Sequence, residues 1–208
     1  MEVSILTVEG LIMFNIKYEN SPGILTYDSS IAIVLYGDNI NLELINQSLE
    51  ICKEKFKSHK DVSYFYEITS TPIWENLFQS AFKKRKFEID NKMDFHYVIA
   101  INVKNTNLLE VLTFHDVKCP DFSLYYFSGF FNRDSMKTSI NDSGFYCTSR
   151  IFDAVSSFVT VREKIQKLAC DDKTFGDDSP EHAFYYYLKT LNLKTYCANT
   201  TTFNEVYK

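Results

Sequence analysis

The chain has 208 residues, of which 45% are hydrophobic and 24% charged, and its formal net charge is -5. This length suits one domain with a large buried core, and the composition excludes a disordered or collagen-like chain. The acidic balance, with a sequence pI near 5.4, excludes the overall positive field with which proteins attract nucleic acids. We therefore expect a single domain over residues 1–208 that has no nucleic-acid partner.

Aromatic and cysteine usage narrows the class further. Aromatic residues make up 16% of the chain, and a dense core is the expected use of so much aromatic surface. The five cysteines are scattered and form no C-x-x-C pair, which is typical of reduced thiols in an intracellular protein. The N-terminal residues lack the basic charge of a signal peptide, and no apolar run is long enough to span a membrane. We expect a soluble, cytoplasmic protein without a transmembrane segment.

The first half of the chain alternates between strand and helix patterns. Residues 1–18 predict one or two short strands, and "SIAIVLYGDN" at 30–39 predicts a strand that is buried on both faces. A helix is predicted over 41–56, with an apolar stripe at spacings of three and four residues. This stripe contains Leu42, Ile45, Leu49, Cys52 and Phe56.

The next segments repeat this alternation. Residues 62–69 predict a strand, and residues 72–89 predict a helix that begins near Pro72. The apolar face expected for this helix consists of Trp74, Leu77, Phe78, Ala81 and Phe82. The basic run 83–86 in the same helix is interpreted as a solvated helix end. "HYVIAI" at 96–101 then predicts a third apolar strand, so a mainly parallel sheet flanked by helices is expected, an α/β fold.

Beyond residue 110 the expected elements are shorter. Residues 123–131 and 144–152 predict strands, and a long helix is predicted over roughly 154–170. Pro180 and Glu181 predict the start of another helix, capped by Asp178 or Ser179. The C-terminal tail suggests one more strand.

Two polar segments follow strands of the predicted parallel sheet. Tyr36, Gly37 and Asp38 close the first of these strands, and residues 102–104 close the third. Ligands of such sheets bind outside the carboxyl ends of the strands, so both segments are candidate ligand contacts. Common catalytic signatures such as a Walker A loop or G-x-S-x-G are absent. The potential metal ligands His115, Asp116 and Cys119 lack a convincing fourth partner, so no metal site is predicted.

The order of several segments resembles a known enzyme family. The segments are "IAIVLYGDN", "YFYEIT", the helix opened by Trp74, "DFHYVIAINVK", "SGFFNRD" and "DDSPEHAFYYYL". In this order they resemble the histo-blood-group type glycosyltransferases of family 6, which have the GT-A fold and retain anomeric configuration. The segment ending in Asn102-Val103-Lys104 is similar to the Asn-x-Asn motif of bacterial members that work without metal, with residues 105–107 as an alternative register.

The resemblance implies a UDP-sugar donor, with a hexose of the galactose or N-acetylgalactosamine type, and a carbohydrate acceptor. It implies that Tyr36, Gly37 and Asp38 border the base and ribose, and that Asn102, Lys104 and Asn105 lie at the diphosphate. It also aligns Glu181 with the family's catalytic glutamate, assisted by His182. The Lys104 ammonium is expected to balance the diphosphate charge in place of a metal ion.

Other positions favour different interpretations. The family's acceptor-binding histidine corresponds to Phe127, and its glycine-rich segment corresponds to residues 147–152, which carry larger side chains. The alternative is a catalytically inactive descendant that serves as a binding or interaction module. Residues 102–107 also suit an ordinary polar turn, and Glu181 suits the first turn of any helix. An unrelated α/β protein whose aromatic residues are all core is the third interpretation.

Overall fold

The computed structural model describes residues 3–8, 11–16, 29–111, 123–127, 129–132, 137–140, 143–171 and 180–197. Its strands are β1 (Val3–Val8), β2 (Leu11–Ile16), β3 (Ile31–Tyr36), β4 (Val62–Phe65), β5 (Tyr97–Asn102), β6 (Ser123–Tyr126), β7 (Gly129–Asn132), β8 (Lys137–Ile140), β9 (Gly144–Thr148) and β10 (Lys194–Cys197). Its helices are α1 (Leu42–Lys55), α2 (Ile73–Asn91), the short 3₁₀ helix η1 (Val103–Asn105), α3 (Leu108–Val111), α4 (Ser149–Ser156), α5 (Phe158–Asp171) and α6 (Pro180–Thr190).

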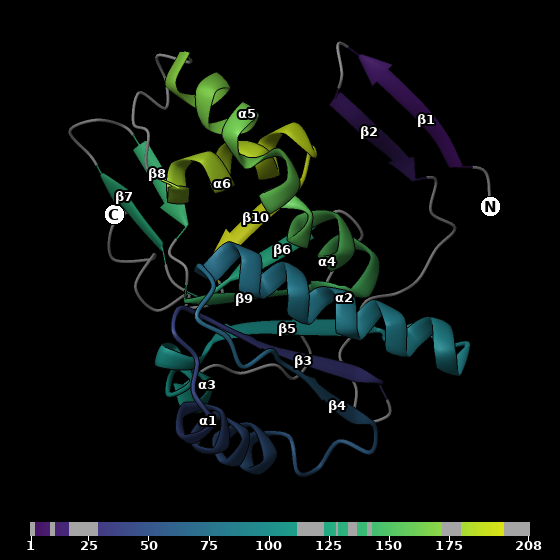
Figure 1. Ribbon diagram of the computed structural model, residues 1–208, viewed down its shortest axis with the longest axis vertical. Helices are drawn as coiled ribbons and strands as arrows, with labels where there is room; N and C mark the ends of the chain where they lie inside the picture. Colours follow the sequence, from purple (N-terminus) through teal and green to yellow (C-terminus); the bar gives the residue numbers. More distant parts are fainter. Residues whose placement is uncertain are drawn as a thin grey trace, which may run out of the picture.

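A six-stranded sheet in the order β10-β6-β9-β5-β3-β4 forms the centre of the protein (Figure 1). The pairs β10–β6, β5–β3 and β3–β4 are parallel, whereas β9 runs antiparallel to both of its neighbours. Strands β1 and β2 pair with each other, as do β7 and β8. The predicted α/β fold with a mostly parallel sheet flanked by helices is therefore confirmed.

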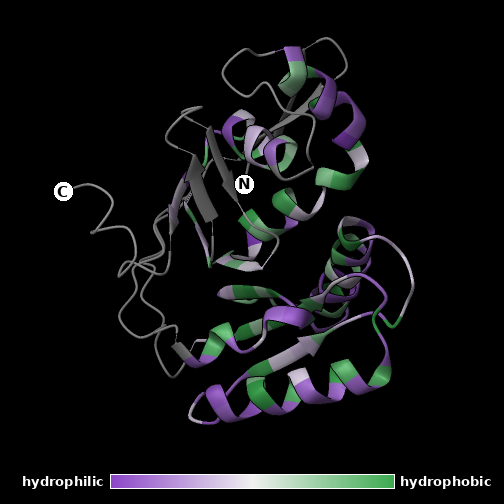
Figure 2. Cartoon of the chain, turned by 90° about the vertical axis from the view of Figure 1, so that its left-hand side faces the viewer, coloured by the Kyte–Doolittle hydropathy of each residue, from purple (hydrophilic) through white to green (hydrophobic). Residues whose placement is uncertain are grey.

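Both faces of the sheet are covered, which explains the continuous apolar runs in the sequence. Helix α1 lies against one face, and α2, α4 and α6 lie on the other side (Figure 1). In β3, Ala32 and Val34 belong to the core on the α2 side, while Ile33 belongs to the core on the α1 side. The hydropathy colouring shows apolar stripes on the helices with polar residues between them (Figure 2). None of the helices in the described ranges is long and apolar enough to cross a membrane.

Several predicted boundaries differ from the structure after residue 143. The strand predicted over 144–152 ends at Thr148, and α4 begins at Ser149. Within α4, Ile151, Phe152 and Val155 are buried at helical spacing. The helix predicted over 154–170 is two helices, because the chain turns at Ser157 between α4 and α5. Helix α6 does begin at Pro180 as predicted, while its proposed caps lie outside the described residues.

The buried face of helix α2 includes three of the five predicted apolar residues, but it also includes polar residues that the prediction left out. Phe82, assigned to the core from its spacing, is 65% exposed. The buried face instead combines Trp74, Leu77 and Ala81 with four polar residues, Asn76, Ser80, Lys84 and Glu88. The expectation that Phe82 is buried was wrong. Polar residues can take the buried face because hydrogen bonds and ion pairs compensate the free-energy cost of burying them. The basic run 83–86 is accordingly not uniformly solvated, since Lys84 is 0% exposed.

A buried group of charges joins α2 to α4, and we call Lys84, Glu88, Ser149 and Asp153 the α2–α4 ion cluster. The Lys84 Nζ lies 3.2 Å from Glu88 Oε2 and 2.7 Å from Asp153 Oδ1. It also donates to the Ser149 hydroxyl, which in turn donates to Glu88 Oε1 over 2.7 Å. The backbone N–H of Phe95, just before β5, donates to the same oxygen over 3.0 Å. The cluster therefore ties two helices to the start of β5.

The two carboxylates of the α2–α4 ion cluster respond differently to their surroundings. Burial acts to raise the pKa of Glu88, but the hydrogen bonds from Ser149 and Phe95 and the Lys84 charge together lower it below its ordinary value. For Asp153 burial is the stronger effect and raises the pKa despite the Lys84 charge. A carboxyl with a lowered pKa stabilises the native state above its unfolded pKa, so the Glu88 contribution is lost as pH falls through its folded pKa.

Replacing Lys84 tests whether the ion cluster holds the helices in place. Lys84→Met gives an uncharged side chain one atom shorter, so the buried cation is lost and, among the described residues, Glu88 keeps only its ion pair of 3.2 Å with the half-exposed Arg85. We expect the free energy of unfolding in urea to fall by about 3 kcal/mol, the usual cost of breaking a buried ion pair. Lys86→Met is the matched control, because Lys86 is an exposed lysine of the same helix, and we expect it to change stability by less than about 0.5 kcal/mol. Equal effects of the two variants would contradict this account.

Candidate functional site

The two polar segments predicted from the sequence lie side by side at the carboxyl ends of two neighbouring strands. Strands β3 and β5 are parallel neighbours, and their pairing ends at Tyr36 opposite Asn102. A Cβ placed on Gly37 would lie 3.0 Å from the Asn102 Oδ1 atom. The order of strands reverses at β3, because β4 lies on one side of it and β5 on the other. Open α/β sheets commonly bind ligands at such a reversal.

The exit of β5 presents one buried amide and one exposed cation. Asn102 is 3% exposed, and its Oδ1 accepts a hydrogen bond of 3.1 Å from the Lys104 N–H. This bond caps η1, as asparagine commonly does at the start of a helical turn. The Lys104 side chain is exposed, and Asn105 is partly buried. The predicted turn is therefore present, and it holds the backbone from which the Lys104 ammonium extends.

The exit of β3 is fixed by hydrogen bonds at both ends. Asp38 is partly buried, and Asn39 has a positive φ of 52°, which asparagine tolerates in a tight turn. Ile40 donates its N–H to the Thr69 carbonyl over 3.1 Å. Asn41 then caps α1, because its Oδ1 accepts from the Leu44 N–H over 2.9 Å. These bonds anchor the chain that follows Gly37 and Asp38 beside Asn102.

Asn76, which the sequence analysis did not single out, connects the ends of β3 and β4. Its side chain is fully buried. Its Oδ1 accepts a hydrogen bond of 3.2 Å from the Gly37 N–H, and its Nδ2 donates to the Glu67 carbonyl over 3.0 Å. An asparagine on the buried face of an apolar helix is the one signal in the sequence that could have indicated this role.

The start of α6 is attached to the same end of α2. His182 is buried, and Glu181 lies in the first turn of α6, with its side chain outside the described part of the structure. Two residues after His182, the Phe184 ring packs on Trp74 with 4.5 Å between ring centroids. The first turn of α2 therefore contacts the β3 exit through Asn76 and the start of α6 through Trp74.

Several positions that depart from the pattern of the resembled family are filled by core side chains. Phe127 is 2% exposed, and Cys147 and Phe152 are 0% exposed. A Cβ on Gly144 would approach the Phe127 ring to 2.6 Å, so the ring lies directly against the β9 backbone. At Gly144, φ is +147°, which an L residue with a side chain rarely adopts. These aromatic and sulfur side chains carry no strong hydrogen-bonding group for a sugar hydroxyl.

Metal and thiol chemistry find little support in the described ranges. Within them, no three side chains of His, Cys, Asp or Glu gather closely enough to hold a metal ion. The segment with His115, Asp116 and Cys119 lies outside the described residues, so the metal-free site stays a prediction. Burial raises the pKa of Cys52 to about 12, which keeps this thiol protonated and unsuited to nucleophilic attack.

Replacing Asn76 tests its role in fixing the β3 exit. Asn76→Ala removes the partners of the Gly37 N–H and the Glu67 carbonyl, and we expect a loss of about 2 kcal/mol in the free energy of unfolding. Amide exchange at Gly37 should accelerate before the remainder of the sheet opens. Asn91→Ala, at an exposed asparagine of the same helix that bonds the Phe87 carbonyl over 2.8 Å, is the control. Unchanged exchange at Gly37 would refute the connecting role.

Comparison with known proteins does not assign the chain to a family. No protein-family model matches it, and no curated protein matches it either. The proposal for its function therefore rests on the geometry at the exits of β3 and β5.

Proposed function

We propose that the protein is a retaining glycosyltransferase that binds a UDP-hexose, of the galactose or N-acetylgalactosamine type, at the carboxyl edge of β3 and β5. The observation that carries this proposal is the juxtaposition of two segments far apart in the sequence, at a reversal of strand order. Tyr36 pairs with Asn102 in the register, and Gly37 lies against the Asn102 side chain. This is the place where sheets of this class bind nucleotides.

In the proposed complex, the β3 exit contacts the nucleoside and the β5 exit contacts the diphosphate. Asp38 follows Gly37 in a loop of fixed conformation, which suits contact with a ribose hydroxyl. The Lys104 side chain is exposed at the same edge. When the bond between the anomeric carbon and the diphosphate breaks, negative charge grows on the departing UDP, and a fixed cation stabilises it. We assign that task to Lys104 and expect no requirement for metal.

The reacting carbon is assigned to the start of α6. Glu181 stands in its first turn, where the helix dipole favours a negative charge. We assign its carboxylate to stabilising the anomeric carbon. There an acceptor hydroxyl would form the new bond with retention while the bond to UDP breaks, and the departing UDP would take the hydroxyl proton. Buried His182 is assigned a supporting position beside it. The support for this part of the proposal is the attachment of α6 and the β3 exit to one turn of α2.

Calorimetric titration with UDP tests the nucleotide site. We expect binding in the presence of EDTA, with no gain on adding Mn²⁺, and about tenfold weaker binding by Lys104→Ala, the usual effect of one charge-assisted hydrogen bond. Lys86→Ala is the control, because Lys86 is also exposed but lies in the later part of α2. Binding that requires Mn²⁺, or equal affinity of Lys104→Ala and the wild type, would overturn the proposed role of Lys104. No binding under either condition would overturn the nucleotide site.

A second candidate function is a non-catalytic binding or interaction module. The buried Phe127, Cys147 and Phe152 favour it, because they occupy positions where the resemblance implies acceptor contacts and a glycine-rich pocket. Incubation with UDP-galactose and UDP-N-acetylgalactosamine separates the two candidates, with free UDP and free sugar followed by NMR. Binding of UDP with neither donor hydrolysis nor sugar transfer to added saccharides would favour the module over the enzyme.

A further inference from the structure

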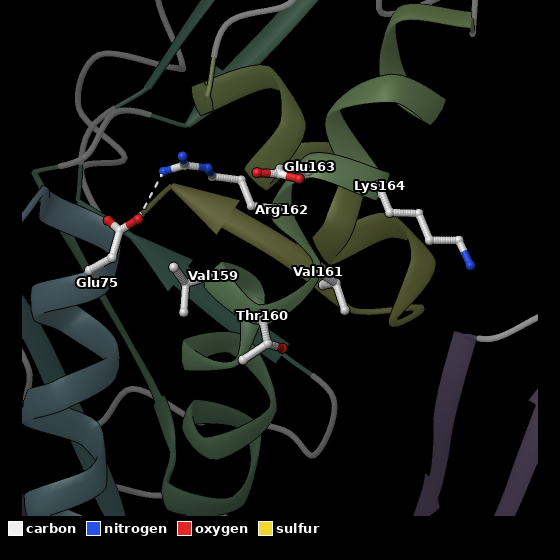
Figure 3. A pocket seen from close by; sticks show the side chains of 7 residues that line it. All are labelled: Glu75, Val159, Thr160, Val161, Arg162, Glu163 and Lys164. Atoms are coloured by element: carbon white, nitrogen blue, oxygen red, sulfur yellow. Dashed lines mark hydrogen bonds and ion pairs between the residues drawn. The ribbon is translucent and has the colours of Figure 1, made fainter.

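A hollow of about 370 Å³ lies between the start of α2 and the first two turns of α5 (Figure 3). Four charged side chains line it, Glu75, Arg162, Glu163 and Lys164, together with Thr160 and two valines. Its volume falls within the range of sites that bind small molecules. The proposed nucleotide contacts at the exits of β3 and β5 do not line it.

An ion pair crosses one side of this hollow. The Arg162 Nη1 atom of α5 lies 3.3 Å from the Glu75 Oε1 atom of α2, and the two side chains are 32% and 33% exposed. The second oxygen of Glu75, Oε2, is covered and has no hydrogen-bond donor among the described residues. A guanidinium and a carboxylate thus stand side by side, and within the described ranges one carboxylate oxygen has no donor. Figure 3 shows Arg162 extending toward Glu75, while the Lys164 side chain points away from Glu75.

The charges around the hollow define the chemistry of a suitable ligand. Two acidic and two basic side chains line it, so their formal charges cancel. A phosphate would require an excess of cations, and a metal ion would require an excess of oxygen ligands. Neighbouring donors and acceptors without net charge instead match hydroxyl groups, each of which donates one hydrogen bond and accepts others.

The position of Glu75 relates this hollow to the proposed reaction. Its chain neighbours are Trp74, which packs on Phe184 of α6, and Asn76, which bonds the Gly37 N–H at the β3 exit. We propose that the hollow binds a neutral, polyhydroxylated ligand through Glu75 and Arg162, and that this ligand is the saccharide acceptor. The acceptor role rests on the proposed function, whereas binding of a neutral saccharide does not.

The test is a titration of the ¹⁵N-labelled protein with lactose and with methyl β-galactopyranoside, followed by amide chemical shifts. Amides of residues 159–164 should shift and saturate, and Glu75→Gln and Arg162→Gln should each weaken binding about tenfold, as expected for one hydrogen bond to a charged group. Both side chains are about one-third exposed, so we expect folded variants, which circular dichroism verifies. Glu50→Gln is the matched control, because it breaks an ion pair of the same 3.3 Å length with Lys53 on α1.

UDP titrations of the same variants separate this inference from the proposed function. Glu75→Gln should keep its UDP affinity, and Lys104→Ala should keep its saccharide affinity. Saccharide binding without UDP binding would support the hollow as a saccharide site while overturning its role as an acceptor site. Two results would overturn the inference and leave the nucleotide site in place. One is UDP binding together with no shifts at residues 159–164 when saccharide is added. The other is UDP binding together with an unchanged saccharide affinity in both Glu75→Gln and Arg162→Gln.

Discussion

Polar side chains on the buried face of α2 need hydrogen-bonding partners inside the protein. These partners lie at opposite ends of the strands of the sheet. At the start of the helix, Asn76 bonds the chain at the exits of β3 and β4. Near its end, Lys84 and Glu88 bond Ser149, Asp153 and the chain entering β5. Hydrogen bonds depend on distance and angle more strictly than apolar contacts do, so these bonds fix the position of the helix. The geometry of the candidate site depends on this constraint.

The fixed helix holds together three segments that the proposed function assigns to one site. The β3 exit, the Glu75–Arg162 hollow and the start of α6 meet three consecutive residues of α2, Trp74 to Asn76. Sites built on rigid elements keep their reacting groups in place better than sites built on loops alone. An enzyme of the proposed kind requires such rigidity, because donor and acceptor must approach in one orientation.

The sequence predicted those parts of the fold that depend on local patterns. β3, α1 and β5 follow from apolar runs and helical spacing, and β3 and β5 bring the two polar segments together as parallel neighbours. The helical start at Ser149 was missed, because that residue is held by Lys84 and Glu88 from a distant helix. The exposed Phe82 was assigned to the core for the same reason, since buried charges determine which face of α2 turns inward.

The Glu75–Arg162 pair could not be anticipated either, because 87 residues separate its members and neither belongs to a recognisable motif. Charged residues in helices are usually solvated, and only the packing of α5 beside α2 brings these two together. The positions of Asn102 and Lys104 at a strand exit were easier to predict, because a strand exit can be read from the sequence once the parallel sheet is inferred.

The insertion of β9 between β5 and β6 has a consequence for how the chain folds during synthesis. β4, β3 and β5 with their helices form a contiguous stretch of the chain, but the far side of β5 pairs with residues 144–148. Until those residues leave the ribosome, β5 presents an open row of backbone donors and acceptors, and Lys84 and Glu88 lack Asp153 and Ser149. Such an edge is a template for pairing with other chains. We therefore expect fragments that stop before β9 to aggregate under conditions in which the full chain folds.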